Sequence, residues 1–230
     1  YFIGARCKSV SSIGSLAHFK KENAPKGATD RCVTCKCEAD CPYSAKKIYL
    51  DLWKADYVRL AGISWPMNAL VEEKFINEDT LTEAIKKGPY GKCVYACDND
   101  VVDNQTVIMH FENGVNATLK MEAFVKHGGR TIRIFGSKGE LVYHAESHSI
   151  VLKRFFGEDE KWDCREIEEV RNPLSKKPDQ KMLDDFFDCI SSAEDRHVNH
   201  DFMESHFIAL AAEESRLGEG QAIDIFKFRN

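Results

Sequence analysis

The chain has 230 residues, a formal net charge of −5 and a pI near 5.9. A chain of this length can bury a core without disulfide bonds, and nine cysteines are too few for a small disulfide-dense scaffold. We therefore expect reduced thiols and a cytoplasmic protein. Lysine and arginine are interleaved with acidic residues, which predicts no nucleic-acid surface, and no apolar run approaches the ~20 residues of a membrane span.

The part of the chain before residue 90 is predicted to be helical and irregular. SAKKIYLDLW (44–53) has the pattern of a helix capped by Ser44. DTLTEAIKKG (79–88) has that of a helix which begins on an Asp79 cap and stops at Gly88 before a proline. GISWPMNALV (62–71), between them, is expected to be a loop over the core.

Residues 92–170 differ in character, because short runs rich in β-branched and aromatic residues replace the helical patterns. The runs are KCVYAC (92–97), QTVIMHF (105–111), VNATLKMEAF (115–124), RTIRIFG (130–136), ELVY (140–143), SIVLKRF (149–155) and CREIEEV (164–170). The alternation of apolar and polar residues in VNATLKMEAF is typical of a strand with one buried face. Asn113-Gly114 and Ser137-Lys138-Gly139 predict short turns, which require antiparallel pairing.

The chain then returns to helical periodicity. DQKMLDDFFDCISS (179–192) and HDFMESHFIALAAEESRLG (200–218) each carry an apolar stripe, and we expect them to cover the apolar side of the strands at 105–124. The predicted fold class is α+β, an open, mainly antiparallel β-sheet with helices covering one face. No G-x-G-x-x-G and no G-x-S-x-G motif occurs, so residue patterns alone indicate no catalytic site.

Several long stretches resemble a known family. They are SIGSLAHFKKENAPKGATDRC (12–32), CPYSAKKIYL (41–50), the segment from YGKCVYACDND to FGSKGEL (90–141) and HFIALAAEESRL (206–217). Together they resemble the C-terminal domain of the Gfo/Idh/MocA oxidoreductases, the family of glucose–fructose oxidoreductase and inositol dehydrogenase. The resemblance covers nearly the whole chain.

The resemblance implies a two-domain parent protein. Its N-terminal Rossmann domain would bind NAD or NADP, and residues 1–230 would be its C-terminal substrate and oligomerisation domain. We expect this chain to lack the Rossmann domain and the catalytic helix, of which 1–4 would be the last turn. The parent is then an oxidoreductase acting on a sugar, polyol or derivative, and the fragment itself is inactive and does not bind the cofactor. The alternative is a non-catalytic binding or scaffold protein with the same fold.

The turn Lys126-His127-Gly128-Gly129-Arg130 is the first candidate substrate site. Paired glycines allow a close approach to a ligand, and His127 and Arg130 can donate hydrogen bonds to hydroxyl or carboxylate groups. The alternative, which the sequence favours, is a hairpin turn with both side chains solvated.

Asn104 is the second candidate, in the segment CDNDVVDNQ (97–105). The segment lacks the glycine and the glutamate of an EF-hand loop, so we expect its aspartates to bond nearby amides. Relatives often carry histidine at the position of Asn104, so the family's substrate preference is in doubt here. A pocket loop rich in His and Gly is also missing from SKKPDQ (175–180).

Four cysteines lie within ten residues, with the spacing C-x2-C-x-C-x3-C: Cys32, Cys35, Cys37 and Cys41. C-x2-C is a common half-site for structural zinc, and Cys93 or Cys97 could complete such a site. The alternative is an irregular loop with buried free thiols that behave as small apolar groups. A redox role ranks third, because the sequence shows no activating partner for a thiol.

The second face of the predicted strands 105–124 is a mixture of polar, charged and apolar residues. His110, Thr118, Lys120 and Glu122 accompany Ile108 and Phe124 on it. A monomer rarely exposes a large patch of this kind. We therefore expect a homo-oligomer through the sheet face, with a C₂ dimer as the first choice.

Overall fold

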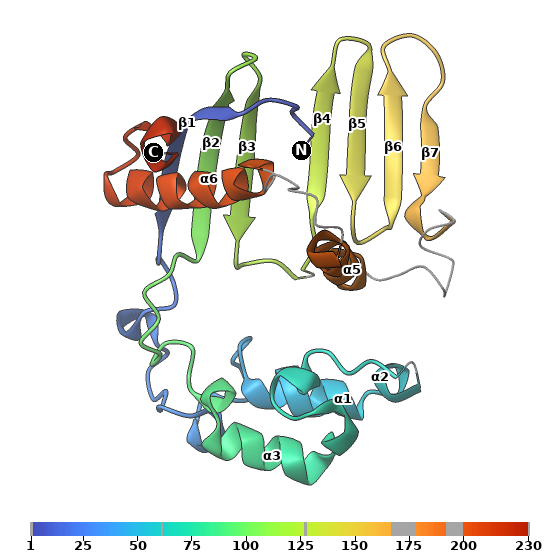
Figure 1. Ribbon diagram of the computed structural model, residues 1–230. Helices are drawn as coiled ribbons and strands as arrows, with labels where there is room; N and C mark the ends of the chain where they lie inside the picture. Colours follow the sequence, from blue (N-terminus) through green and yellow to red (C-terminus); the bar gives the residue numbers. More distant parts are fainter. Residues whose placement is uncertain (1, 61, 127, 167–177, 192–199, 230) are drawn as a thin grey trace. The chain divides into compact units, whose positions relative to one another are not determined.

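A computed structural model describes residues 2–60, 62–126, 128–166, 178–191 and 200–229. The chain divides into two compact units. One unit contains residues 2–123 and 208–230, and the other contains residues 124–207. Each contains a four-stranded antiparallel sheet, and Figure 1 shows strands of both sheets.

The sheet of the first unit has the strand order β3-β2-β1-β8, and all neighbours are antiparallel. Its strands are β1 (Cys7–Ser15), β2 (Asn104–Phe111), β3 (Asn116–Glu122) and β8 (Ile223–Asp224). The hairpin predicted at Asn113-Gly114 is confirmed, because the Phe111 N–H donates to Val115 O at 2.9 Å. Gly114 has a φ of 83°, a conformation that glycine adopts without strain.

Strand β1 is a correction, because the sequence predicted no strand before residue 90. Its buried residues are Cys7, Val10 and Ser12, and the register shifts between Cys7 and Ser9. An extra residue at a bulge breaks the period-two alternation. The strand is also rich in serine, so it carries little of the apolar signal by which strands are recognised.

Helix α6 (His200–Leu217) contacts β1 through Ser215, whose Oγ accepts a 2.8 Å hydrogen bond from the Ser12 N–H. On the same face of the sheet Val107 is buried, as predicted for the apolar side of the strands at 105–124, and so is Val10 of the unpredicted strand β1. Leu119, which pairs with Val107 from the outer strand β3, is 52% exposed. Within the described residues, the apolar face predicted to lie under helices is therefore buried on β1 and β2, whereas part of it is exposed on β3.

The same unit contains a helical segment between β1 and β2. It comprises the π-helix Lys46–Asp51, α1 (Leu52–Lys54), α2 (Asp56–Leu60) and α3 (Glu78–Lys87) around a core of Val58, Met67 and Leu81. Ser44 acts as predicted, because its Oγ accepts the Lys47 N–H at 3.3 Å.

Two predictions in this segment are wrong. The cap of α3 is Asn77, which forms a capping box with Thr80, rather than Asp79. KCVYAC (92–97) is no strand, because only Lys92 forms an isolated bridge, to Arg31. Cys93 and Tyr95 are buried in irregular chain, and Cys97 is half-buried. The apolar side chains of the segment gave it the composition of a strand.

The second unit contains the sheet β4-β5-β6-β7 and α5 (Pro178–Ser191). The strands are β4 (Thr131–Gly136), β5 (Gly139–His144), β6 (Ser149–Arg154) and β7 (Glu160–Asp163). The turn predicted at 137–139 is confirmed by the pairing of Gly136 with Gly139. CREIEEV begins with a 3-10 helix, Cys164–Glu166, and continues outside the described residues.

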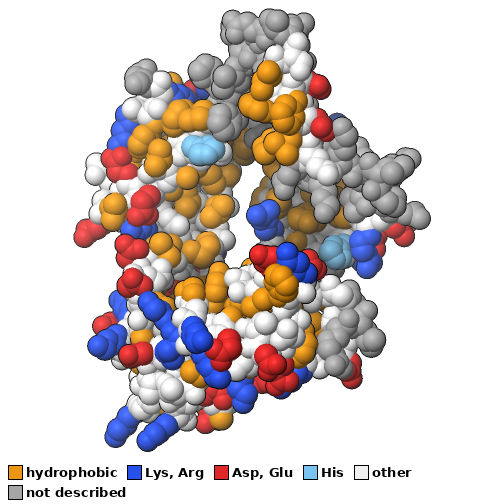
Figure 2. Space-filling view, turned by 60° about the horizontal axis from the view of Figure 1, so that its bottom comes forward, with side chains coloured by type: hydrophobic (Ala, Val, Ile, Leu, Met, Phe, Trp, Pro, Cys, Tyr) orange, Lys and Arg blue, Asp and Glu red, His pale blue; other side chains and the backbone are white. Residues whose placement is uncertain are grey.

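Large apolar side chains are exposed in this unit. On α5 they are Met182, Leu183, Phe186, Phe187 and Ile190, and on the sheet they include Ile134, Phe135 and Trp162. Figure 2 shows hydrophobic side chains of this kind on the surface of the molecule. Because α5 and the strands at 105–124 belong to different units, the packing predicted between them stays a prediction.

The α+β class and the antiparallel pairing are confirmed, with the strands arranged in two sheets of four rather than one open sheet. None of the helices in the described part of the chain is both long and apolar enough to span a membrane.

Candidate functional site

A pocket of about 370 Å³ lies at one end of the sheet β4-β5-β6-β7. It is lined by Val125, Gly128, Gly129, Arg130, Thr131, His144, Glu146 and Ser147. Arg130, predicted as a substrate contact, is thus part of a pocket. His127 lies outside the described residues, so its role stays a prediction.

The chain folds locally so that two segments, 125–131 and 144–147, meet at this pocket. Thr131 at the start of β4 pairs with His144 at the end of β5, which places both side chains on one face. The Ala145 N–H donates to Arg130 O at 3.0 Å, and this bond extends the pairing by one step. Ser147 Oγ lies 2.7 Å from Ser149 Oγ in the turn that leads into β6.

Strand β3 pairs with β2 and strand β4 pairs with β5, so residues 126–130 connect a strand of one unit to a strand of the other. The hairpin alternative for these residues stays a prediction. A Cβ on Gly128 would have no neighbour within 4 Å, and one on Gly129 would make an ordinary 3.7 Å contact with Ala145. The backbone therefore does not require glycine here, and the two glycines leave the pocket open.

The pocket combines a guanidinium, an imidazole, a carboxylate and two hydroxyl groups: Arg130, His144, Glu146, Thr131 and Ser147. These groups can donate and accept hydrogen bonds in several directions, as recognition of a polyhydroxylated molecule requires. Arg130 can also pair with an anionic group in bidentate fashion. The lining is exposed, so each such bond would compete with water.

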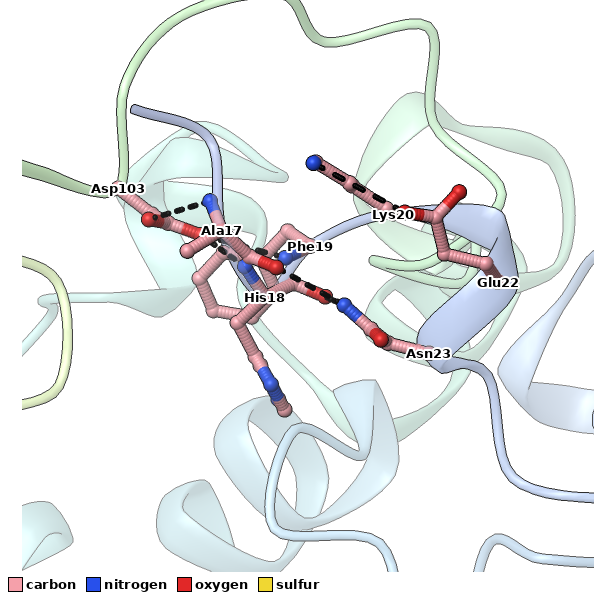
Figure 3. Close-up of polar contacts among 7 residues, drawn as sticks. All are labelled: Ala17, His18, Phe19, Lys20, Glu22, Asn23 and Asp103. Atoms are coloured by element: carbon pink, nitrogen blue, oxygen red, sulfur yellow. Dashed lines mark hydrogen bonds and ion pairs between the residues drawn. The ribbon is translucent and has the colours of Figure 1, made fainter. Parts of the chain in front are cut away.

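The second candidate, Asn104, lies in the other unit beside a buried carboxylate. Figure 3 shows Asp103 facing the backbone nitrogens of Ala17, His18 and Phe19. Its oxygens accept their N–H groups at 2.9, 2.7 and 3.3 Å. The Asn104 amide adds a fourth donor at 2.9 Å.

These donors determine the charge of Asp103. Burial alone would raise its pKa, because the charged form loses water. Hydrogen bonds from the Ala17 and His18 N–H groups, Asn104 and the Phe19 N–H outweigh burial and lower the pKa to about 2. The predicted bonding of aspartate to nearby amides is found in the bond from Asn104, whereas the three backbone partners lie 84–86 residues away in the sequence.

Asn104 has a structural role in this arrangement. Besides Asp103, its Nδ2 is within 3.2 Å of Ser15 O and 3.4 Å of Ser15 Oγ. The side chain thus joins the start of β2 to the end of β1. A contact between Asn104 and substrate stays a prediction.

Sequence reasoning missed an aromatic cluster below this carboxylate. His18 Nε2 lies 3.0 Å from Tyr95 Oη, and the rings of Phe19 and Tyr43 pack edge-on with centroids 5.1 Å apart. The cluster joins three segments that are irregular in structure. Neither periodicity nor a motif could have indicated it, because irregular segments have no fixed side-chain period.

The four cysteines of the C-x2-C-x-C-x3-C segment lie in a loop with a 3-10 turn, Cys32–Thr34. Cys93 joins them, because its N–H donates to Asp30 O at 2.8 Å. Burial raises the pKa of the Cys32 thiol and outweighs the hydrogen bond from the Ala45 N–H, which lowers it. The nearby Cys93, Cys41 and Cys35 raise this pKa further. These four cysteines are free thiols, as are Cys7, Cys93, Cys97 and Cys164.

No three histidine, cysteine, aspartate or glutamate side chains within the described ranges form a group that could hold a metal ion. The structure therefore does not assign Cys32, Cys35, Cys37 and Cys41 as metal ligands. The structural zinc predicted from their spacing stays a prediction.

Three solved structures share part of the fold. An oxidoreductase assigned as NADPH-dependent from Desulfitobacterium hafniense DCB-2 is 16% identical over 59% of this chain, with a TM-score of 0.43. Levoglucosan dehydrogenase in complex with NADH and levoglucosan is 20% identical over 54%, with a TM-score of 0.40. An inositol dehydrogenase homologue from Azotobacter vinelandii, in complex with NADH and myo-inositol, is 12% identical over 54%, with a TM-score of 0.37.

The chain spans about two fifths of the length of these proteins, with coverage of 40%, 39% and 39%. At such identities and TM-scores, nothing about activity follows from the likeness. No curated protein matches the chain.

The sequence comparison is more specific. Residues 72–142 match the GFO/IDH/MocA C-terminal domain, and they include α3, β2, β3 and β4. This stretch overlaps the segment 90–141 on which the predicted resemblance was based. The resemblance is therefore confirmed: residues 72–142 are a GFO/IDH/MocA C-terminal-domain sequence.

Proposed function

We propose that the chain is the C-terminal domain of an NAD(P)-dependent oxidoreductase that acts on a sugar, a polyol or a derivative of one. In this proposal the domain shapes the substrate pocket and mediates oligomerisation. The match of residues 72–142 to the GFO/IDH/MocA C-terminal domain carries the proposal. Levoglucosan and myo-inositol, the ligands named with NADH in the titles of two of the similar structures, serve as probes of this substrate class.

The nicotinamide cofactor belongs to the parent protein in this proposal. A dinucleotide is held by a glycine-rich turn at a helix N-terminus, where backbone N–H groups face the pyrophosphate. The sequence has no G-x-G-x-x-G motif that would form such a turn. We therefore expect no saturable change in nicotinamide fluorescence when the isolated chain is titrated with NADH. Saturation in the micromolar range would contradict this assignment.

The pocket around Arg130 supplies the substrate contact. Its donors and acceptors suit a ring of hydroxyl groups, and its volume of about 370 Å³ is in the range of small-ligand sites. In the parent protein, the domain would hold the sugar by these groups while the other domain presents the nicotinamide. The proton donor of the reaction is expected on the parent's catalytic helix.

Ligand-observed NMR with myo-inositol, levoglucosan and gluconate tests this role. Arg130→Ala removes the guanidinium from the pocket, while Arg6→Ala removes an equally exposed arginine from the other unit. We expect at least one probe to bind, and to bind about 5-fold or more weakly to Arg130→Ala but not to Arg6→Ala. Equal weakening in both variants, or binding unaffected by Arg130→Ala, would remove the pocket from the proposal.

The second face of the sheet β3-β2-β1-β8 is the proposed contact with another copy. Ile13 and Ile108, which share this face, are 72% and 53% exposed. Thr118 and Lys120 lie beside them, so the face mixes apolar and polar groups. Burying it against an identical face would remove the exposed isoleucines from water.

A further inference from the structure

A groove of about 710 Å³ lies at one end of the β4–β5 pair, and the pocket around Arg130 lies at the other end. The two share none of their lining residues, and the groove belongs to a single unit. The function proposed above does not use it. Its lining includes three aliphatic side chains, two phenylalanines and a lysine: Ile134, Leu141, Leu152, Phe155, Phe156 and Lys138.

The pairing of the strands builds the floor of this groove. Ile134 of β4 pairs with Leu141 of β5, and Leu141 pairs with Leu152 of β6, so the three side chains form a row on one face of the sheet. Two strand spacings of about 4.8 Å separate the ends of the row, which makes the apolar floor roughly 10 Å wide. One six-membered ring does not cover a floor of this width, whereas two fused rings do.

The groove is recessed because two glycines follow this row. Gly136 and Gly139 pair with each other on the same face, two residues beyond Ile134 and Leu141. A Cβ on Gly139 would lie 2.2 Å from Lys153 O, so the close approach of β5 to β6 requires glycine there. The two positions therefore leave bare backbone, against which a flat molecule can lie.

Two phenylalanines that follow β6 form a wall of the groove. The Phe155 N–H donates to Lys138 O at 3.2 Å, and this bond holds the wall to the turn between β4 and β5. Phe155 and Phe156 are 64% and 95% exposed. Aromatic rings beside bare backbone favour a flat aromatic ligand, which can stack on them or meet them edge-on.

The rim of the groove carries one uncompensated positive charge. Arg154 pairs with Glu160, and Glu140 pairs with two basic residues of the neighbouring strands, so the charges of both lining residues are balanced. Lys138 has no carboxylate partner among the residues that the structure describes. The Lys138 ammonium and the Ser137 hydroxyl, which also lines the groove, can therefore donate hydrogen bonds to a carboxylate of a ligand.

We propose that this groove binds an aromatic carboxylate of two fused rings, with the rings against the glycine pair and the carboxylate at Lys138. The width of the apolar floor favours two rings over one. The bare backbone and the phenylalanine wall favour a flat aromatic molecule over an acyl chain, and the unbalanced lysine favours an acid over a neutral molecule. The site is separate from the pocket around Arg130, so the proposal goes beyond the function proposed above and does not depend on it.

The full chain is titrated with 2-naphthylacetate, and binding is followed by ligand-observed NMR. Neutral 2-naphthylacetamide and aliphatic octanoate are the comparison ligands, and each should bind about 3-fold or more weakly. Phe156→Ser should raise the Kd of 2-naphthylacetate about 5-fold or more, and Lys138→Met should raise it about 3-fold or more. The matched controls Phe135→Ser and Lys161→Met, which change exposed residues on the opposite face of the same sheet, should leave this Kd unchanged.

Methyl NMR of the wild type locates the ligand without any variant, because 2-naphthylacetate should shift the methyl signals of Ile134 and Leu152. The proposal is overturned if no saturable binding occurs up to about 5 mM, if either comparison ligand binds as tightly, or if the matched controls weaken binding equally. Weaker binding to Arg130→Ala would place the ligand in the other pocket and would also overturn it. Methyl signals of Ile134 and Leu152 that shift with protein concentration alone would place a second copy of the chain in the groove instead.

Discussion

Replacing Asp103 by asparagine should destabilise the fold by a measurable and pH-dependent amount. Asp103 is 2% exposed, and its carboxylate accepts four hydrogen bonds, three of them from backbone N–H groups. The substitution keeps one acceptor oxygen but places an NH₂ group against N–H donors. Donors that face each other in a buried site lose their bonds and gain no water in return.

The magnitude follows from the pKa. A carboxyl whose pKa falls from 3.8 to about 2 on folding favours the ionised folded state by about 2.5 kcal/mol, at about 1.36 kcal/mol per pKa unit. We therefore expect Asp103→Asn to lower the free energy of unfolding by about 2–4 kcal/mol at pH 7. Asp98→Asn, an exposed aspartate in the same segment, should change it by less than about 0.5 kcal/mol.

The sign of the pH dependence follows as well. Because the folded pKa lies below the unfolded one, this contribution is fully present above pH 3.8 and is lost as the pH falls through about 2. Near pH 3, roughly half of it remains. Urea unfolding of the wild type and both variants at pH 7 and pH 3, followed by far-UV circular dichroism, tests this. A difference between wild type and Asp103→Asn that is below 1 kcal/mol at pH 7, or that does not shrink at pH 3, would refute the reasoning.

Three further predictions concern other positions. Gly91→Ala should lower the free energy of unfolding, measured by heat or urea, by about 3 kcal/mol or more, because its Cβ would lie 1.6 Å from Ile85 O. Gly128→Ala, whose Cβ would meet open space, should leave this free energy unchanged. Arg31→Met should lower the free energy of unfolding by about 2–3 kcal/mol, since Arg31 Nη2 donates to Ile85 O and Gly88 O at the end of α3, at 2.8 and 2.7 Å. A loss below about 0.5 kcal/mol would count against a capping role of Arg31 for this helix. In light scattering at tens of micromolar, Ile108→Glu should dissociate the proposed oligomer, while Leu119→Glu, equally exposed on the opposite face, should not; a monomeric wild type would dismiss the interface.

The local elements with regular periodicity were predictable from the sequence. Strands β2 to β6 and helices α5 and α6 follow the predicted ranges, because alternation and apolar stripes record which side of each element is buried. Gly114 was predicted correctly as a turn residue, because its φ of 83° is a conformation that glycine adopts without strain. Gly88 was predicted correctly as the end of α3, where a Cβ would lie 2.6 Å from Ala84 O.

The contacts between distant segments were not predictable. Strand β1 is central in its sheet, yet its bulge and its serines conceal the alternation. The backbone partners of Asp103 lie 84–86 residues away, and no local pattern encodes them. The pocket around Arg130 was predicted only in part, because His144 and Glu146 reach it through the pairing of β4 with β5.

The most direct test of the central claim uses the full-length protein that contains this chain. The purified protein is supplied with NAD⁺ or NADP⁺ and a panel of sugars and polyols that includes myo-inositol and levoglucosan, and reduced nicotinamide is followed by its absorbance. The account predicts substrate-dependent reduction with at least one member of the panel. It also predicts that Arg130→Ala raises KM about 10-fold with a smaller change in kcat, while Arg6→Ala changes neither. A full-length protein that binds neither NADH nor NADPH and reduces neither oxidised cofactor with any member would contradict the account.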